Sequence, residues 1–133
     1  MTVKIGTEGA TLSFSIERRE RGEVEFLTRY SDSHFGGQIV SSDYMSGSPA
    51  ELFRAMATEW RGWEGEKGWE DLEGRLKLRA VIDSLGHVNL SVEMTRYSPL
   101  GKLAGEVNID AGQLEDIAIE MEALFNPPFA PAP

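Results

Sequence analysis

Apolar and polar residues alternate along three segments of the first 45 residues, and this alternation predicts three strands. The segments are residues 11–17, 24–28 and 35–40, separated by a charged turn and by a short polar break. A period of two is typical of strands with one buried face. We expect an antiparallel meander here. Its inward positions are Leu12, Phe14, Ile16, Val24, Phe26 and Thr28.

A second meander is predicted between residues 72 and 109. Alternating apolar positions run through residues 72–82, 88–94 and 103–109, with glycine-containing turns between them. Placing Ala80 opposite Leu90 also sets Lys77 opposite Glu93. Opposite charges in such a cross-strand pair are favourable, so this register is the one we expect.

Two amphipathic helices follow the two meanders. The first opens at Ser48-Pro49-Ala50-Glu51, an N-terminal capping pattern with proline at the first helical position. The second opens at Asp110, with glutamine three residues later, and covers residues 114–125. Apolar residues recur at helical spacing in both. In the first helix these residues are Leu52, Phe53, Met56, Trp60 and Trp63.

The order strands–helix–strands–helix predicts an α+β fold. Each meander has one apolar face and each helix one apolar stripe, so the simplest arrangement lays both helices on one face of a single antiparallel sheet of about six strands. We expect one domain over residues 1–126, followed by a proline-rich tail over residues 127–133 whose Phe129 is a candidate docking residue.

Composition restricts the partners. The net charge is −9, with 16 acids against 13 bases through residue 102 and six acids with no base after it. Such a balance repels a phosphate backbone, so we expect no nucleic-acid partner. The chain has no cysteine, and it shows no apolar leader or membrane-spanning run. We therefore expect a cytoplasmic protein with no membrane contact.

All three tryptophans lie in the run W-R-G-W-E-G-E-K-G-W-E-D-L-E-G over residues 60–74. This run, with the strands after it, resembles a family of small bacterial domains of unknown function whose members carry W-x-G-W-x-G-x-K-x-W-x-S-L-E-G. The resemblance covers residues 48–125. Asp71 departs from it, because the family pattern has serine there. The resemblance implies a fold and no activity.

No catalytic signature is present. His34 and His87 lack metal-ligand spacing, although the two could still assemble in space with Asp83 or Asp32 as a two-histidine, one-carboxylate metal site. No nucleophile elbow occurs, and the paired carboxylates of the glycine-rich run favour a solvated loop over acid–base chemistry. We expect neither an enzyme nor a bound metal or cofactor.

The small size, the acidity and the absence of a catalytic motif favour a non-enzymatic interaction protein. One version is an immunity-type inhibitor that covers a basic toxin or nuclease with the acidic face of the second helix, where steering would be salt-sensitive. That face comprises Glu115, Asp116, Glu120 and Glu122.

A small-molecule pocket is the alternative, with tryptophans at its mouth. The pocket would lie between the first helix and the sheet, and the residues at its mouth would be Trp63, Lys67 and Trp69. Homodimerisation through a sheet edge or the tryptophan loop is a further alternative.

Overall fold

The computed structural model describes residues 1–7 and 9–128 and contains two antiparallel sheets of four strands each. Strands follow one another in chain order within each sheet. The first sheet comprises β1 (Thr2–Ile5), β2 (Ala10–Glu20), β3 (Glu23–Asp32) and β4 (Gly36–Ser42). The second comprises β5 (Lys67–Glu70), β6 (Leu76–Ile82), β7 (His87–Tyr97) and β8 (Leu100–Asp110).

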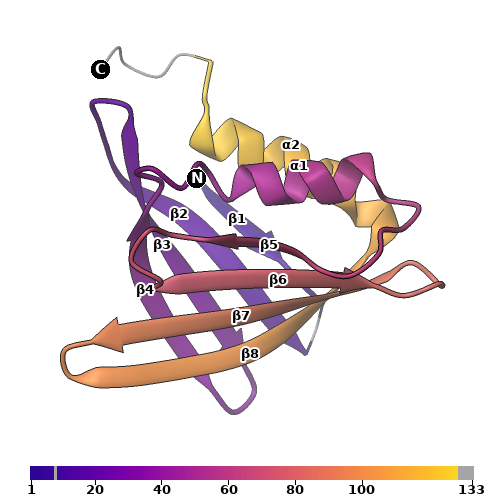
Figure 1. Ribbon diagram of the computed structural model, residues 1–133, viewed down its shortest axis with the longest axis horizontal. Coiled ribbons are helices and arrows are strands. Elements are labelled where there is room, and N and C mark those ends of the chain that lie inside the picture. The colour runs from indigo at the N-terminus through magenta and orange to yellow at the C-terminus, as the bar shows by residue number, and fades with distance from the viewer. Residues whose placement is uncertain (8, 129–133) are drawn as a thin grey trace.

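One helix follows each sheet. Helix α1 (Ala50–Thr58) comes after β4, and a short 3₁₀ turn, η1 (Ala111–Gln113), leads from β8 into α2 (Leu114–Phe125). The two helices lie side by side along one side of the molecule (Figure 1). Helix α2 contacts β1 and α1 contacts β5, so the helix pair bridges one edge strand of each sheet.

The α+β class and the strands–helix–strands–helix order are confirmed, but the single sheet of about six strands is wrong. The meanders form two separate sheets whose strands cross each other in Figure 1. Alternation tells which face of each meander is apolar. It does not tell whether that face is covered by helices or by a second sheet, and here the two inner faces cover each other.

The two missed strands are short edge strands. Strand β1 has only four residues, of which Val3 and Ile5 are buried against β2. Strand β5 lies inside the tryptophan-rich run, where Trp69 is its one fully inward residue. Four residues give too little alternation to be separated from a loop.

The sheets approach each other most closely where glycine leaves room for a large side chain. A Cβ atom at Gly105 in β8 would lie 2.4 Å from Cζ of Tyr30 in β3. Tyr30 is buried, and its hydroxyl donates to the Asp32 carboxylate at 2.7 Å. Leu103 occupies the corresponding space above Gly37 in β4. These contacts fix how the second sheet sits on the first.

The predicted register and the second helix start are confirmed. Ala80 pairs with Leu90 and Lys77 with Glu93. The Asp110 N–H donates to Oε1 of Gln113 at 3.2 Å, and the Asp110 side chain accepts the Gln113 N–H, so both halves of the predicted capping box are present.

The end of the first helix is predicted wrongly. Helix α1 stops at Thr58, so Trp60 and Trp63 lie beyond it. The chain leaves helical geometry at Glu59, with φ of −107° and ψ of 35°, and Gly62 beyond it has φ of +138°, a conformation that favours glycine. The helical spacing of the two tryptophans is therefore a coincidence of a loop sequence.

Among the described residues, no helix has both the length and the apolarity needed to cross a membrane. Pro127 and Pro128 follow α2, whereas Phe129 and the rest of the predicted tail lie outside the described residues.

Candidate functional site

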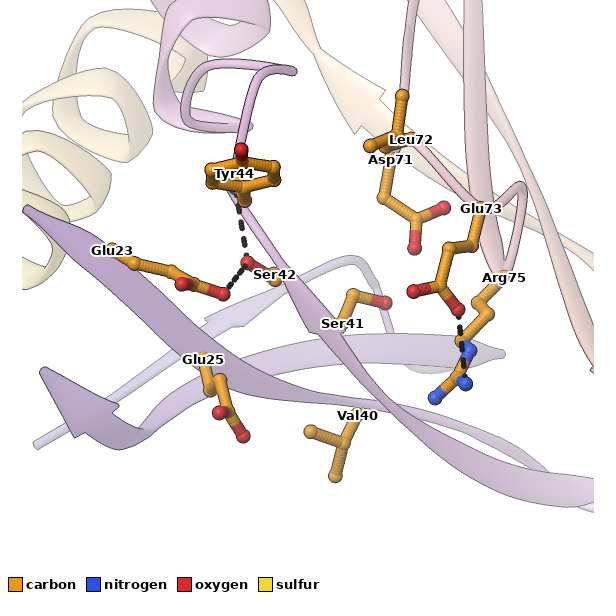
Figure 2. Close-up of a pocket in the computed structure, with 10 residues that line it drawn as sticks. All are labelled: Glu23, Glu25, Val40, Ser41, Ser42, Tyr44, Asp71, Leu72, Glu73 and Arg75. Carbon is orange, nitrogen blue, oxygen red and sulfur yellow. Dashed lines mark hydrogen bonds and ion pairs between the residues drawn. The ribbon is translucent and has the colours of Figure 1, made fainter. Parts of the chain in front are cut away.

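A groove of about 260 Å³ lies between β4, the start of β3 and the turn that joins β5 to β6 (Figure 2). Three segments far apart in the sequence meet here, and most side chains that line it are acidic or carry a hydroxyl. We call it the acidic groove. Its lining comprises Glu23, Glu25, Val40, Ser41, Ser42, Tyr44, Asp71, Leu72, Glu73 and Arg75.

Hydrogen bonds fix the strand side of the acidic groove. Ser42 donates its hydroxyl to Glu23 at 2.7 Å and accepts the Tyr44 N–H at 3.0 Å. Glu25 pairs with Arg18 on the neighbouring strand. Glu23 is held by a neutral donor and makes no ion pair within residues 1–7 and 9–128.

The turn side is organised by Asp71. Asp71 is buried, and its side-chain carboxylate accepts the Leu76 N–H at 3.1 Å. The backbone carbonyl of Asp71 accepts the Gly74 N–H. Tyr97 on β7 donates its hydroxyl to the Glu73 carbonyl at 2.9 Å and ties the turn to the sheet. Aspartate at this position closes the turn through its own side chain, as a serine hydroxyl also does in such turns.

Charges within the acidic groove do not balance. Four carboxylates line it against a single guanidinium, Arg75, which pairs with Glu73 at 3.0 Å. Asp71, like Glu23, has no cationic partner in the described part of the chain. The groove therefore has a negative potential that favours a cationic ligand.

The hydroxyl group of Ser41, a residue that lines this groove, makes no hydrogen bond in the described part of the chain. Ser41 is 4% exposed. Figure 2 shows the hydroxyl pointing to the side of β4 where the Asp71–Arg75 turn lies. A buried hydroxyl without a partner costs about 1–3 kcal/mol.

Apolar side chains border the polar lining. Val40, Tyr44 and Leu72 all expose large parts of their side chains at the groove, and Met45 beside them is also exposed. An apolar border around an acidic floor matches a lysine or arginine side chain, whose stem is aliphatic and whose head is charged.

Nothing in the acidic groove points to catalysis or metal binding. Neither histidine lines it. Across the described residues, no group of three or more His, Asp or Glu side chains is arranged to hold a metal ion. The arrangement can bind a cation by hydrogen bonds and charge.

Each histidine meets its own aspartate, in a different turn. The His34 N–H donates to Asp32 at 2.7 Å in the β3–β4 turn. The His87 ring lies 3.2 Å from the Asp83 carboxylate in the β6–β7 turn. The backbone N–H of His87 is the main cause that lowers the pKa of Asp83. These are local turn contacts.

The tryptophan site predicted from the sequence is divided in the structure. Lys67 lies with its ammonium 5.5 Å from the Trp63 ring centroid and pairs with Glu59 at 2.6 Å. Trp63 donates its indole N–H to the Ala80 carbonyl at 3.3 Å. Trp69 is 7% exposed and belongs to the core. Trp63 and Lys67 therefore lie together, while Trp69 is placed to support the fold.

The predicted acidic face of α2 is also divided. Arg54 on α1 binds Glu115 at 2.6 Å and Glu122 at 2.5 Å, so these two carboxylates join the helices. The hydrogen bond from Arg54 lowers the pKa of Glu122. Asp116 and Glu120 are exposed on the outer face of the helix.

The acidic groove was not predicted from the sequence, although one signal for it exists. Ser41 follows Ile39 at the strand period and so falls on the inward face of β4. A polar side chain at an inward position is the kind of observation that marks a site.

Comparisons with known proteins place the chain in a family. A model of a family of unknown function (DUF6228) matches residues 4–128, and no curated protein matches. A solved structure of the plant transcriptional regulator PBF-2 is similar with a TM-score of 0.51 at 11% identity, over 94% of this chain and 80% of that one. At this identity the likeness shows the fold alone. The chain belongs to the DUF6228 family, which confirms the resemblance to a domain of unknown function.

Proposed function

We propose that this DUF6228 protein is a non-enzymatic interaction module that binds a basic segment of a partner protein in the acidic groove. One observation carries the proposal: two carboxylates without an ion-pair partner and a Ser41 hydroxyl without a hydrogen-bond partner, among the described residues, line the same groove beneath an apolar border. An immunity-type inhibitor of a basic toxin is one protein of this kind, and that role and a bacterial origin stay predictions.

An arginine or lysine side chain fits this groove by chemistry. Its aliphatic stem contacts the exposed apolar side chains, and the ring of Tyr44 offers a face to a cation. Its head donates to Glu23 on one side of β4 or to Asp71 on the other, neither of which makes an ion pair in the described part of the chain. Charge-assisted hydrogen bonds of this kind are about twice as strong as neutral ones.

The net charge supports a basic protein partner over a nucleic acid. With a charge of −9, the chain attracts cationic proteins over long range and repels phosphates. The similar fold of a plant transcriptional regulator does not change this, since function depends on the site and not on the fold.

The test compares two variants with the same change in charge. The groove variant carries Glu23→Gln and Glu73→Gln, and the control carries Asp116→Asn and Glu120→Gln on α2. The probe is a short blocked peptide that alternates arginine and valine, titrated by calorimetry at low and high salt. Asp71 is left unchanged because it holds the turn.

We expect the groove variant to bind the peptide about tenfold or more weakly, a loss of about 1.4 kcal/mol, with a smaller dependence on salt. The control should bind like the parent protein. If the control loses as much affinity as the groove variant, the peptide is held by overall charge or by α2, and the proposal is wrong. Absence of any peptide binding by the parent protein would also contradict it.

A further inference from the structure

Strand β4 is an edge strand whose outer side is open. It pairs with β3 and with no other strand of the described chain. Asp43 N–H donates to the Val24 carbonyl at 3.1 Å, and Asp32 N–H donates to the Phe35 carbonyl at 2.8 Å at the other end of the ladder. Bonded and non-bonded pairs alternate in an antiparallel ladder. The β4 backbone groups that point away from β3 are those of Gly36, Gln38, Val40 and Ser42.

The open side of β4 runs into the acidic groove. Residues 40–42 line the groove together with the turn between β5 and β6. In Figure 2, Glu23 and Glu25 lie on one side of β4 and the Asp71–Arg75 turn on the other. The space beside the unpaired backbone is therefore flanked by the carboxylates of the turn, whereas Glu23 and Glu25 lie across β4 from it.

Strand β4 also lacks the features that normally block strand addition. Edge strands are usually protected by charged side chains, proline, a bulge or a covering helix. The sequence of β4, GGQIVSS, has neither a charge nor a proline. Every other edge strand carries at least one charged residue, namely Lys4 in β1, Lys67 and Glu70 in β5, and Lys102, Glu106 and Asp110 in β8. Strand β1 is in addition contacted by α2.

We propose that the basic segment of the partner binds in an extended conformation, as a fifth strand added to the open edge of β4. This inference rests on the proposed function and specifies its geometry. The backbone of the added segment pairs with Val40 and Ser42. Its side chains point alternately to the two faces of the sheet.

The alternation decides which side chains the segment must carry. Side chains on the outer face come next to Ser42 and the carboxylate of Glu25, which share that face. Those on the inner face come next to Ser41 and the carboxylates of the β5–β6 turn. An arginine–valine segment carries all its arginines on one face. In the added strand these arginines lie on the inner face beside the turn carboxylates, the valines lie on the outer face beside Val40, and the main-chain pairing gives the affinity that is common to all such segments.

A pair of N-methylated peptides tests the strand addition. Both are versions of the arginine–valine peptide, one methylated at the odd backbone nitrogens and the other at the even ones. In an added strand, every second N–H donates to β4 and the others point away. We expect one methylated peptide to bind at least about tenfold more weakly than the other, which should bind like the unmethylated peptide.

The result separates the two proposals. Equal affinity of the two methylated peptides, whether both retain binding or both lose it, would overturn the added strand. If Glu23→Gln and Glu73→Gln still weaken the unmethylated peptide in that case, the acidic groove remains the binding site and only the extended pairing is wrong. If the unmethylated peptide does not bind, the proposed function itself fails.

Discussion

Replacing Trp69 tests whether this side chain holds the β5–β6 turn of the acidic groove in place. This residue lies two positions before Asp71, and its side chain is 7% exposed. Its ring centroid is 5.8 Å from that of Phe26 in the other sheet, and its indole N–H donates to the Gly47 carbonyl at 3.1 Å. Trp69 therefore ties β5 both to the first sheet and to the segment before α1, which holds the β5–β6 turn opposite β4.

The expected cost follows from these contacts. Trp69→Ala removes a large buried side chain and leaves a cavity, which costs about 3–5 kcal/mol of unfolding free energy. Trp69→Phe keeps most of the ring but leaves the Gly47 carbonyl without its donor, at a cost of about 1–3 kcal/mol. Trp60→Ala is the matched control, because Trp60 is 51% exposed and its loss should cost about 0.5 kcal/mol or less.

The assay is thermal and urea unfolding followed by circular dichroism, since tryptophan fluorescence changes with the substitution itself. For a chain of this length, 1 kcal/mol corresponds to about 3–5 °C in Tm. Trp69→Ala should therefore lower Tm by about 10–20 °C. The reasoning is refuted if Trp60→Ala destabilises the protein as much as Trp69→Ala does.

Two further substitutions test the packing of the sheets and the helices. Gly105→Ala should destabilise the protein by about 1–3 kcal/mol by urea unfolding, because its Cβ would collide with Tyr30, whereas Gly112→Ala, with no atom within 4 Å, should be close to neutral; equal effects would contradict the close approach of the sheets. Glu122→Gln should lower Tm at neutral pH. The Arg54 hydrogen bond lowers the pKa of the folded Glu122 from its ordinary value of 4.5, so its stabilisation is present above that value and lost as pH falls through the folded pKa. The Tm difference between parent and variant should then shrink in acid, and a constant difference across pH would contradict this role.

The alternation of side chains predicts most strands, because an antiparallel sheet with one buried face imposes a period of two. The same pattern is satisfied by one sheet under helices or by two sheets face to face. What decides between them is packing at positions such as Gly105, where the absence of a side chain admits Tyr30. No local pattern links these two residues, which are far apart in the sequence.

Helix spacing was misleading at the tryptophans for a related reason. Trp60 and Trp63 follow Met56 at helical intervals, yet the chain leaves the helix after Thr58. The positive φ of Gly62 decides the path beyond it.

The candidate site was harder to predict because it needs three separate segments. Its carboxylates look like ordinary surface charges in the sequence, and the acids of α2 look more concentrated. In the structure, by contrast, two acids of α2 are paired, because Arg54 binds Glu115 and Glu122. Glu23 in the acidic groove makes no ion pair within residues 1–7 and 9–128.

The central claim is that a basic segment binds beside β4 and opposite the β5–β6 turn. Titrating the ¹⁵N-labelled protein with the arginine–valine peptide, and following the backbone amide signals by NMR, tests this claim most directly. We predict that the largest shifts occur in residues 40–42 and 71–75, with little change at Asp116 and Glu120 on α2. Shifts concentrated on α2 or around Trp60, with residues 40–42 unaffected, would contradict the account.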